Sequence, residues 1–290
     1  MSSKPTVFIT GASSFMGAHI CHFLAPHCRI IGGYYQTKLH FPQVQSLRLD
    51  LTNRKDIDNV KNHNIDYIVH VAGKIKPSAH GLSAYQTNRL MMKHLLSLEK
   101  PMIYASSTAV HWEVDIPYVK ARQEDEQELK SSGLPFVILR PCAPYGPSLK
   151  QHQPKHKESF QTLVDIVKKS PVIPILGDGQ YLRQPVHVYD FAVLILHAIQ
   201  NGLDQTAFDV AGSQAYTFTQ IIRILQGSLH RKQPLIYIPK RIALAGSRLF
   251  PNLETSLVSV MDTSEAFDVS LVQNRIPLRS FGYGHLDLLI

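Results

Sequence analysis

Short apolar runs alternate with polar, helix-like stretches through the first half of the chain. Each run is brief and bounded by polar residues, which is typical of central strands that are buried on both faces of a sheet. The expected strands are residues 7–10, 29–33, 46–49, 66–71, 102–105 and 136–140. Helical or mixed polar segments lie between them. This alternation predicts an α/β fold built on a doubly wound parallel sheet.

The pattern changes after Pro141, where a loop rich in Pro, Gly and Lys begins. Helices are expected at residues 160–169, 191–199 and 218–229, with a glycine turn at 177–179 and a strand at 207–210. We therefore expect two domains, residues 1–144 and a smaller C-terminal α+β lobe of residues 145–290. Part of the second range, about 184–210, is expected to return to the sheet. The lobe should cover the carboxyl ends of the parallel strands, where such sheets bind ligands.

A glycine turn directly follows the first expected strand. Its residues are Thr10, Gly11, Ala12, Ser13, Ser14, Phe15, Met16 and Gly17, and an apolar helix face at Met16, Ile20, Phe23 and Leu24 continues from them. A strand, a glycine turn and a helix in this order open a Rossmann domain. Gly11 would form the turn, Gly17 would let the helix approach the strand, and the helix N-terminus would face a pyrophosphate. Ser14 replaces the usual middle glycine. We predict a dinucleotide site at Thr10, Gly11, Ser13, Ser14, Phe15, Met16 and Gly17.

Composition indicates an ordinary globular chain. The 290 residues are 44% hydrophobic and 18% charged, as in typical globular domains. The longest apolar run, 191–199, is too short to span a bilayer, and the first strand starts too early to leave room for a signal peptide. The three cysteines, Cys21, Cys28 and Cys142, form no CxxC pair. We expect a cytoplasmic protein with reduced cysteines and no membrane partner.

The net charge of +8 could attract nucleic acid, or it could attract a phosphorylated cofactor and a diphosphate substrate. The basic residues are scattered, and the chain contains no RNA motif with interleaved aromatics, no zinc finger and no helix-turn-helix pattern. This favours small phosphorylated ligands, so no nucleic-acid partner is predicted. The fifteen histidines include no HExxH motif, and no metal site is predicted.

Further motifs follow the glycine turn in a fixed order, and together they carry a resemblance. They are Asp50-Leu51, DYIVHVAG at 66–73, Asn88, ASSTAV at 105–110, Leu139-Arg140-Pro141 with Tyr145-Gly146-Pro147, and Gly177-Asp178-Gly179 with Arg183 and HVYD at 187–190. From residue 7 to about 225 the chain resembles the extended short-chain dehydrogenase/reductases, of the NAD-dependent epimerase/dehydratase type that acts on nucleotide sugars.

The resemblance implies further cofactor contacts. Asp50 and Leu51 would hold the adenine, and Ala72 and Gly73 would pass beneath the cofactor. Lys74, Asn88 and Pro141 complete the expected cofactor-binding set. Enzymes that prefer NAD carry an acidic residue at the end of the second strand, but residues 32–38 contain none. Lys38 could meet a 2′-phosphate, which predicts NADP with NAD as the alternative; Lys38 could equally begin a solvated loop.

The same resemblance implies catalytic residues. The family uses a tyrosine and a lysine four residues later, on one helix face, where the positive charge lowers the pKa of a tyrosine. Tyr118 fits this frame, but the lysine position holds Arg122. Arginine keeps the charge but is bulkier and never loses its proton, so a catalytic and a non-catalytic interpretation both stand. Ser107 is the expected catalytic hydroxyl, with Thr108 as the alternative.

Thr108, Tyr145 and Arg183 are the expected substrate residues. Arg183 could clamp a diphosphate with two hydrogen bonds, or it could brace the lobe. Trp112 could stack on a substrate or cover the core. The leading hypothesis is an NAD(P)-dependent oxidoreductase or epimerase that acts on a nucleotide-linked sugar, and the resemblance also suggests a homodimer. The competing hypothesis is a non-catalytic dinucleotide-binding sensor or regulator of the same fold.

Overall fold

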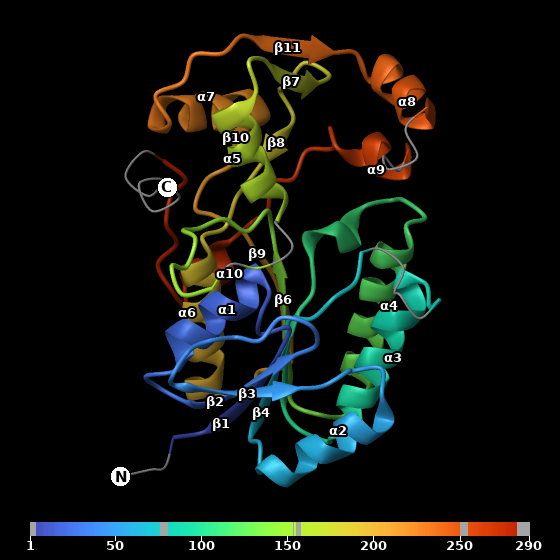
Figure 1. Cartoon of the computed structure of the whole chain (residues 1–290), viewed down its shortest axis with the longest axis vertical. Coiled ribbons are helices and arrows are strands. Elements are labelled where there is room, and N and C mark those ends of the chain that lie inside the picture. Colours follow the sequence, from blue (N-terminus) through green and yellow to red (C-terminus); the bar gives the residue numbers. More distant parts are fainter. Residues whose placement is uncertain (1–3, 76–80, 153, 155–157, 250–254, 283–290) are drawn as a thin grey trace.

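The main sheet of the computed structural model contains seven strands, all parallel (Figure 1). The structure describes residues 4–75, 81–152, 154, 158–249 and 255–282. The strands are β1 (Thr6–Thr10), β2 (Arg29–Tyr34), β3 (Val44–Arg48), β4 (Tyr67–His70), β5 (Met102–Ala105), β6 (Phe136–Pro141) and β9 (Thr206–Val210). Their order across the sheet is β3-β2-β1-β4-β5-β6-β9. The predicted Rossmann-like α/β fold is confirmed.

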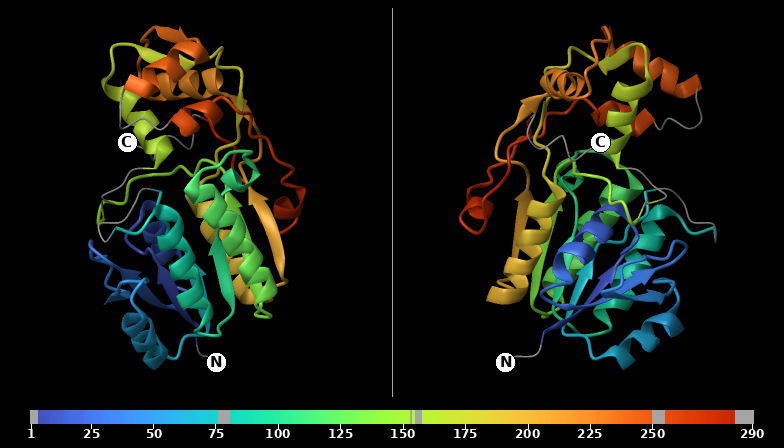
Figure 2. Two further views of the ribbon diagram at one scale, coloured as in Figure 1. Left: turned by 90° about the vertical axis from the view of Figure 1, so that its right-hand side faces the viewer. Right: turned by 60° about the vertical axis from the view of Figure 1, so that its left-hand side comes forward.

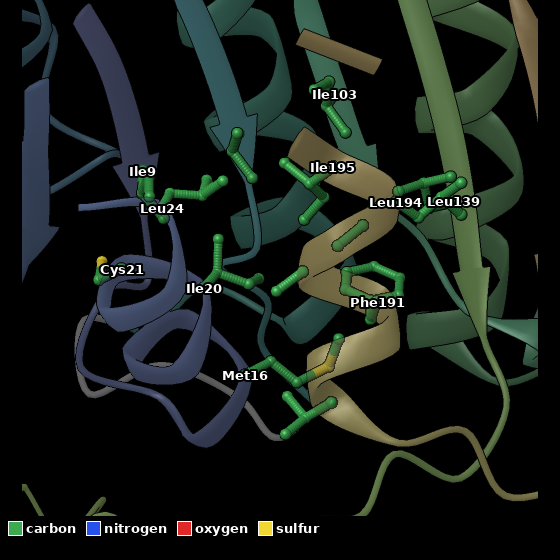
Figure 3. Packing of buried hydrophobic residues seen from close by; sticks show 14 of the residues in the cluster. Ile9, Met16, Ile20, Cys21, Leu24, Ile103, Leu139, Phe191, Leu194 and Ile195 are labelled. Atoms are coloured by element: carbon green, nitrogen blue, oxygen red, sulfur yellow. The ribbon is translucent and has the colours of Figure 1, made fainter. Parts of the chain in front are cut away.

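Helices cover both faces of this sheet, and alternate strand residues face them. On one face, Val7 and Ile9 of β1 join a buried cluster with α1 (Phe15–Leu24) and α6 (Val188–Asn201). Figure 3 shows residues of α1 and α6 that meet beside the strands in this cluster. On the other face, Phe8 packs with residues of α2 (Arg54–Val60), α3 (Ala84–Leu96) and α4 (Pro117–Ser131). Short 3₁₀ turns follow α2, at η1 (Lys61–His63), and precede α4, at η2 (Thr108–His111).

A smaller lobe follows β6 and lies beyond the carboxyl end of that strand (Figure 2). Its elements are α5 (Ser159–Lys169), β7 (Ile173–Leu176), β8 (Leu182–Arg183), β10 (Tyr216–Thr217), α7 (Phe218–Ser228), β11 (Leu235–Ile238), α8 (Lys240–Leu249) and α9 (Thr255–Val260). β7 pairs with β11 in parallel, and β8 pairs with β10 antiparallel. Between β8 and β10 the chain returns to the main sheet as α6 and β9. The last described helix, α10 (Ser270–Gln273), also packs beside β9.

Across the described ranges of the chain, no helix combines the length and the apolar character needed to cross a bilayer. The same ranges contain no group of three or more His, Cys, Asp or Glu side chains that could hold a metal ion. Cys21, Cys28 and Cys142 are buried free thiols.

Candidate functional site

The glycine turn brings β1, α1 and the end of β4 into close contact. Gly11 has φ +62°, and a Cβ there would lie 2.9 Å from the Cα of Ala72. A Cβ on Gly17 would lie 2.1 Å from the carbonyl oxygen of Gly11. Only glycine allows both the left-handed backbone at Gly11 and this close helix approach at Gly17. The turn therefore has the shape that the sequence predicted.

Ser14 closes this turn and caps α1. Its N–H donates to the Gly11 carbonyl (2.9 Å), and its hydroxyl accepts from the Gly17 N–H (3.0 Å). The amides of Phe15 and Met16 belong to the first turn of α1, where a helix supplies no internal acceptor. An anion at this N-terminus would be stabilised by them. Ser13 has a different partner, since its carbonyl oxygen lies 2.9 Å from Nε2 of His152.

Two polar side chains hold the segment that follows β4. The Thr10 hydroxyl accepts from the N–H groups of Val71 (3.1 Å) and Ala72 (3.2 Å). Buried Asn88, on α3, donates to the Lys74 carbonyl and accepts from the Lys74 N–H, both at 2.8 Å. The segment with Ala72, Gly73 and Lys74 is therefore fastened against the glycine turn. The structure brings these predicted cofactor residues together.

Asp50 and Leu51 follow β3. The Asp50 carboxylate accepts from the Thr52 N–H (2.8 Å) and hydroxyl (2.6 Å), so it shapes the turn. The Leu51 carbonyl lies 2.9 Å from Nδ1 of His94. These contacts hold the backbone at the end of β3. The adenine contact of Asp50 and Leu51 stays a prediction.

Lys38 is exposed in the connection between β2 and β3. It lines an open depression of about 410 Å³ whose other lining residues are Leu39, His40, Phe41, Pro42, Val44 and Ser46. None of these residues is acidic. The surroundings of Lys38 thus offer positive charge without a competing carboxylate.

The three hydroxyl residues after β5 have separate roles. Ser106 is buried and donates to Oε1 of Glu126 (2.7 Å). Thr108 is buried and donates to Oε1 of Glu265 (3.1 Å). Ser107 is half-buried and caps η2 by accepting from the Ala109 N–H (3.2 Å). Of these three residues, Ser107 is the most accessible to a ligand.

Tyr118 and Arg122 lie one turn apart on α4, as their spacing predicted. The Arg122 guanidinium carbon is 5.1 Å from the centroid of the Tyr118 ring. Arg122 is only 3% exposed, and its Nη1 donates to the Tyr104 hydroxyl (2.6 Å). Its Nε is buried without a hydrogen-bond partner. Tyr118 is half-buried beside Trp112 and Val114.

A charged network surrounds Arg122. The Tyr104 hydroxyl donates to Asp125 (3.1 Å), and Arg89 of α3 donates to the other Asp125 oxygen (2.5 Å). Burial raises the pKa of Asp125 despite these bonds, and burial also raises the pKa of Tyr104. Burial alone would lower the pKa of Arg122. The phenolic oxygens of Tyr104 and Tyr118 together have the larger effect, so the pKa of Arg122 is raised.

His70 of β4 lies on the other side of Tyr104. The two rings stack with centroids 5.3 Å apart, and His70 Nδ1 is 2.8 Å from the Thr10 hydroxyl. Burial, together with the charge of Arg122, lowers the pKa of His70 to about 3. His70 is therefore neutral at physiological pH and adds no second positive charge.

The structure places two of the predicted substrate residues within the framework of the lobe. Arg183 donates to the carbonyls of Leu182, Thr263 and Met261, and its Nε lies 3.4 Å from Glu265. Backbone acceptors occupy the guanidinium, as the bracing alternative requires, and diphosphate binding by Arg183 stays a prediction.

Tyr145 is fully buried in the lobe core. Its ring meets those of Phe160, His187 and Phe281. Pro141 and Cys142 are also buried, and burial raises the pKa of the Cys142 thiol to about 12. Cys142 therefore packs as a neutral thiol between the lobes.

Sequence reasoning missed Tyr104, Asp125 and Glu265. Tyr104 lies in an apolar run, and Asp125 lies three positions after Arg122 on a polar helix, so the helical spacing of Asp125 was a usable signal. Glu265 accepts from Trp112 Nε1 (3.2 Å) as well as from Thr108. It lies in an irregular segment with no local pattern that would single it out.

The chain is similar in sequence to several known proteins. The chain is 23% identical over 294 residues to dTDP-4-dehydro-6-deoxy-D-allose reductase of Streptomyces bikiniensis, covering 84% of this chain and 87% of the relative. It is 24% identical over 284 residues to the chloroplast stem-loop binding protein of 41 kDa b of Arabidopsis thaliana, covering 86% and 70% respectively.

Among solved structures, the fold is similar to UDP-glucose 4-epimerase from Bifidobacterium longum in complex with NAD⁺ and UDP. The TM-score is 0.74 at 17% identity, covering 95% of this chain and 93% of the other. The model of the NAD dependent epimerase/dehydratase family matches residues 7–211, which contain the glycine turn, Ser107, Tyr118 and Arg122. This chain therefore belongs to the NAD-dependent epimerase/dehydratase family.

Proposed function

We propose that this protein is an NAD(P)-dependent oxidoreductase or epimerase that acts on a nucleotide-linked sugar or a related hydroxyl or carbonyl substrate. The observation that carries the proposal is the arrangement on α4, where the Arg122 cation lies 5.1 Å from the Tyr118 ring. Half-buried Ser107 lies at the end of the neighbouring strand β5. A phenol beside a fixed cation is suited to acid–base catalysis.

The residues of the glycine turn fit a dinucleotide. The absence of a Cβ at Gly11 and Gly17 permits the close approach of strand and helix, and the first-turn amides of α1 suit a pyrophosphate. Asn88 and Thr10 would hold the segment beneath the cofactor. When bound, the nicotinamide supplies or accepts a hydride at its C4 position.

In this proposal Tyr118 gives a proton to, or takes one from, the reacting oxygen of the substrate. Ser107 donates a hydrogen bond to the same oxygen. Arg122 stays protonated and stabilises negative charge on the Tyr118 oxygen, which a buried cation does more strongly than an exposed one.

NADP is the proposed cofactor, with NAD as the alternative. Exposed Lys38 and the lack of an acidic lining residue around it support a 2′-phosphate. The similar structure from Bifidobacterium longum contains NAD⁺, and this supports NAD as the alternative cofactor.

A second candidate function is a non-catalytic dinucleotide-binding regulator. The observation that favours it is Arg122 itself, because arginine at the lysine position cannot pass on a proton. One relative of similar identity is named as a stem-loop binding protein.

Calorimetry and turnover assays separate the two candidates. The wild type is titrated with NADP and NAD and then assayed by nicotinamide absorbance against a panel of UDP- and dTDP-linked sugars and their keto forms. We expect turnover that falls by about 100-fold or more in Tyr118→Phe and stays unchanged in Tyr85→Phe, a phenol that is bonded to Glu124 outside the site. Cofactor binding without turnover would support the regulator. Failure to bind either dinucleotide would overturn both.

A further inference from the structure

The guanidinium of Arg122 lies inside the protein, beneath the segment that the cofactor is proposed to cover. A Cβ on Gly73 would lie 2.1 Å from Nη2 of Arg122. Gly73 itself is exposed, whereas Arg122 is 3% exposed. Since the side chain has almost no accessible surface, it cannot touch a ligand on the outer side of Gly73 without moving.

Tyr104 and Asp125 hold this buried cation in place. Arg122 Nη1 donates to the Tyr104 hydroxyl (2.6 Å), which in turn donates to Asp125 (3.1 Å). Arg89 bonds the second Asp125 oxygen and also Glu128 (2.6 Å). A buried charge without such partners would be strongly unfavourable. The chain of contacts connects Arg122 to acidic groups at the surface of α4.

The groups that face the Arg122 guanidinium come from three elements. β4 contributes neutral His70, β5 contributes Tyr104, and α4 contributes Tyr118 and Asp125. Arg89 of α3 reaches this set through Asp125. Asp125 is thus the carboxylate that the Tyr104 hydroxyl links to the cation, and Tyr118 is a phenol whose ring lies against it.

We propose that Tyr104 and Asp125 are positioning residues. They hold Arg122 as a fixed buried cation, which stabilises negative charge on the Tyr118 oxygen and does not bind the cofactor ribose. This inference rests on the proposed function for its catalytic consequence. The planar guanidinium meets the Tyr104 hydroxyl with one nitrogen while it lies against the Tyr118 ring, a geometry that a compact ammonium group cannot reproduce. The shape of the arginine side chain therefore fits both Tyr104 and Tyr118 in this chain.

The first test separates cofactor binding from turnover in Arg122→Gln. We expect kcat to fall by about 100-fold, while the Kd for NADPH, measured by calorimetry, changes by less than about threefold. A Kd that weakens tenfold or more would show that Arg122 binds the cofactor and would overturn the inference.

The second test uses the pH–rate profile. Tyr104→Phe removes the hydroxyl that holds the cation, so the profile should move to higher pH. Asp125→Asn removes a nearby negative charge and keeps an oxygen that accepts from Tyr104, so the profile should move to lower pH. Lost packing alone would not move the two profiles in opposite directions. Unchanged profiles, or shifts in the same direction, would overturn the electrostatic role. Lys120→Gln, which removes an exposed charge of α4, should leave the profile unchanged.

A third measurement does not depend on turnover. In an NMR spectrum of ¹⁵N-labelled protein, the Arg122 Nε–H signal is assigned by its loss in Arg122→Lys. We expect slow solvent exchange in the wild type and in Lys120→Gln, and exchange at least about tenfold faster in Tyr104→Phe. Rapid exchange in the folded wild type would overturn the buried arrangement. Slow exchange in a protein that turns over no substrate would support the arrangement and refute only the proposed function.

Discussion

Thr108 and Glu265 are joined by a hydrogen bond of 3.1 Å, although 157 positions separate them in the chain. Glu265 is 8% exposed and also accepts from Trp112 (3.2 Å). Its backbone N–H donates to the Leu182 carbonyl of β8 (2.9 Å). Glu265 therefore connects the end of β5 to the smaller lobe, directly beside the candidate catalytic hydroxyl.

Removal of the Glu265 carboxylate should loosen this connection. Glu265→Ala leaves the buried Thr108 hydroxyl and the part-buried Trp112 Nε1–H without this acceptor, and we expect a loss of about 2 kcal/mol in the free energy of unfolding. Glu265→Gln keeps one oxygen acceptor and should lose about half as much. Urea denaturation measures both variants, with exposed Glu113→Gln as the control. Equal stability of Glu265→Ala and the wild type would contradict the connecting role.

Ser106 and Ser107 should respond differently to alanine. Ser107→Ala is expected to lower kcat by about 100-fold through loss of a donor to the reacting oxygen, and to cost about 1 kcal/mol through loss of the cap on η2. Ser106→Ala should cost about 1–2 kcal/mol because it removes the bond to buried Glu126, with little change in kcat. Steady-state kinetics and urea denaturation are measured on both. A larger kcat loss in Ser106→Ala would reassign the catalytic hydroxyl.

His70 should make the protein less stable in acid. Its pKa is lowered to about 3 in the folded state, against about 6.5 in an unfolded chain. Between these values the unfolded chain binds a proton that the folded protein does not, so the free energy of unfolding falls as pH falls from about 6.5 toward 3. Urea denaturation across this range should show a shallower pH dependence in His70→Asn. Exposed His27→Asn should keep the wild-type slope, and an unchanged slope in His70→Asn would contradict the assignment.

Lys38 should decide the choice between the two dinucleotides. Lys38→Glu is expected to weaken NADPH binding by about tenfold or more, because a carboxylate would repel the 2′-phosphate, and to change NADH binding by less than about threefold. Calorimetry with both cofactors measures the difference. Lys55→Glu reverses an exposed charge on α2 and should affect neither. Equal weakening of both cofactors would assign Lys38 a general electrostatic effect only.

The sheet could be predicted because its strands are local patterns. The expected strand 102–105 coincides with β5, and 207–210 lies within β9. The expected strand 46–49 differs from β3 (Val44–Arg48) by two residues at its start and by one residue at its end. β3 has a single neighbouring strand and is half exposed, so its apolar pattern is weak and its ends are poorly marked.

The arrangement of candidate site residues could be predicted where spacing along one element places them. The distance of four residues puts Tyr118 and Arg122 on one helix face, and Gly11 and Gly17 mark one turn. Arg183 was harder to interpret, because its partners at Met261 and Thr263 are about 80 residues away and are backbone carbonyls. A backbone acceptor leaves no signature in the sequence.

The sequence by itself determined the Rossmann-like sheet, the glycine turn and the pair on α4, because each depends on the order of residues within one segment. The tertiary structure alone decided that Arg122 points inward to Tyr104 and Asp125, that Tyr145 is core, and that Glu265 meets Thr108. Burial and hydrogen bonding between distant segments depend on how the elements pack. No local pattern encodes which side chains that packing brings together.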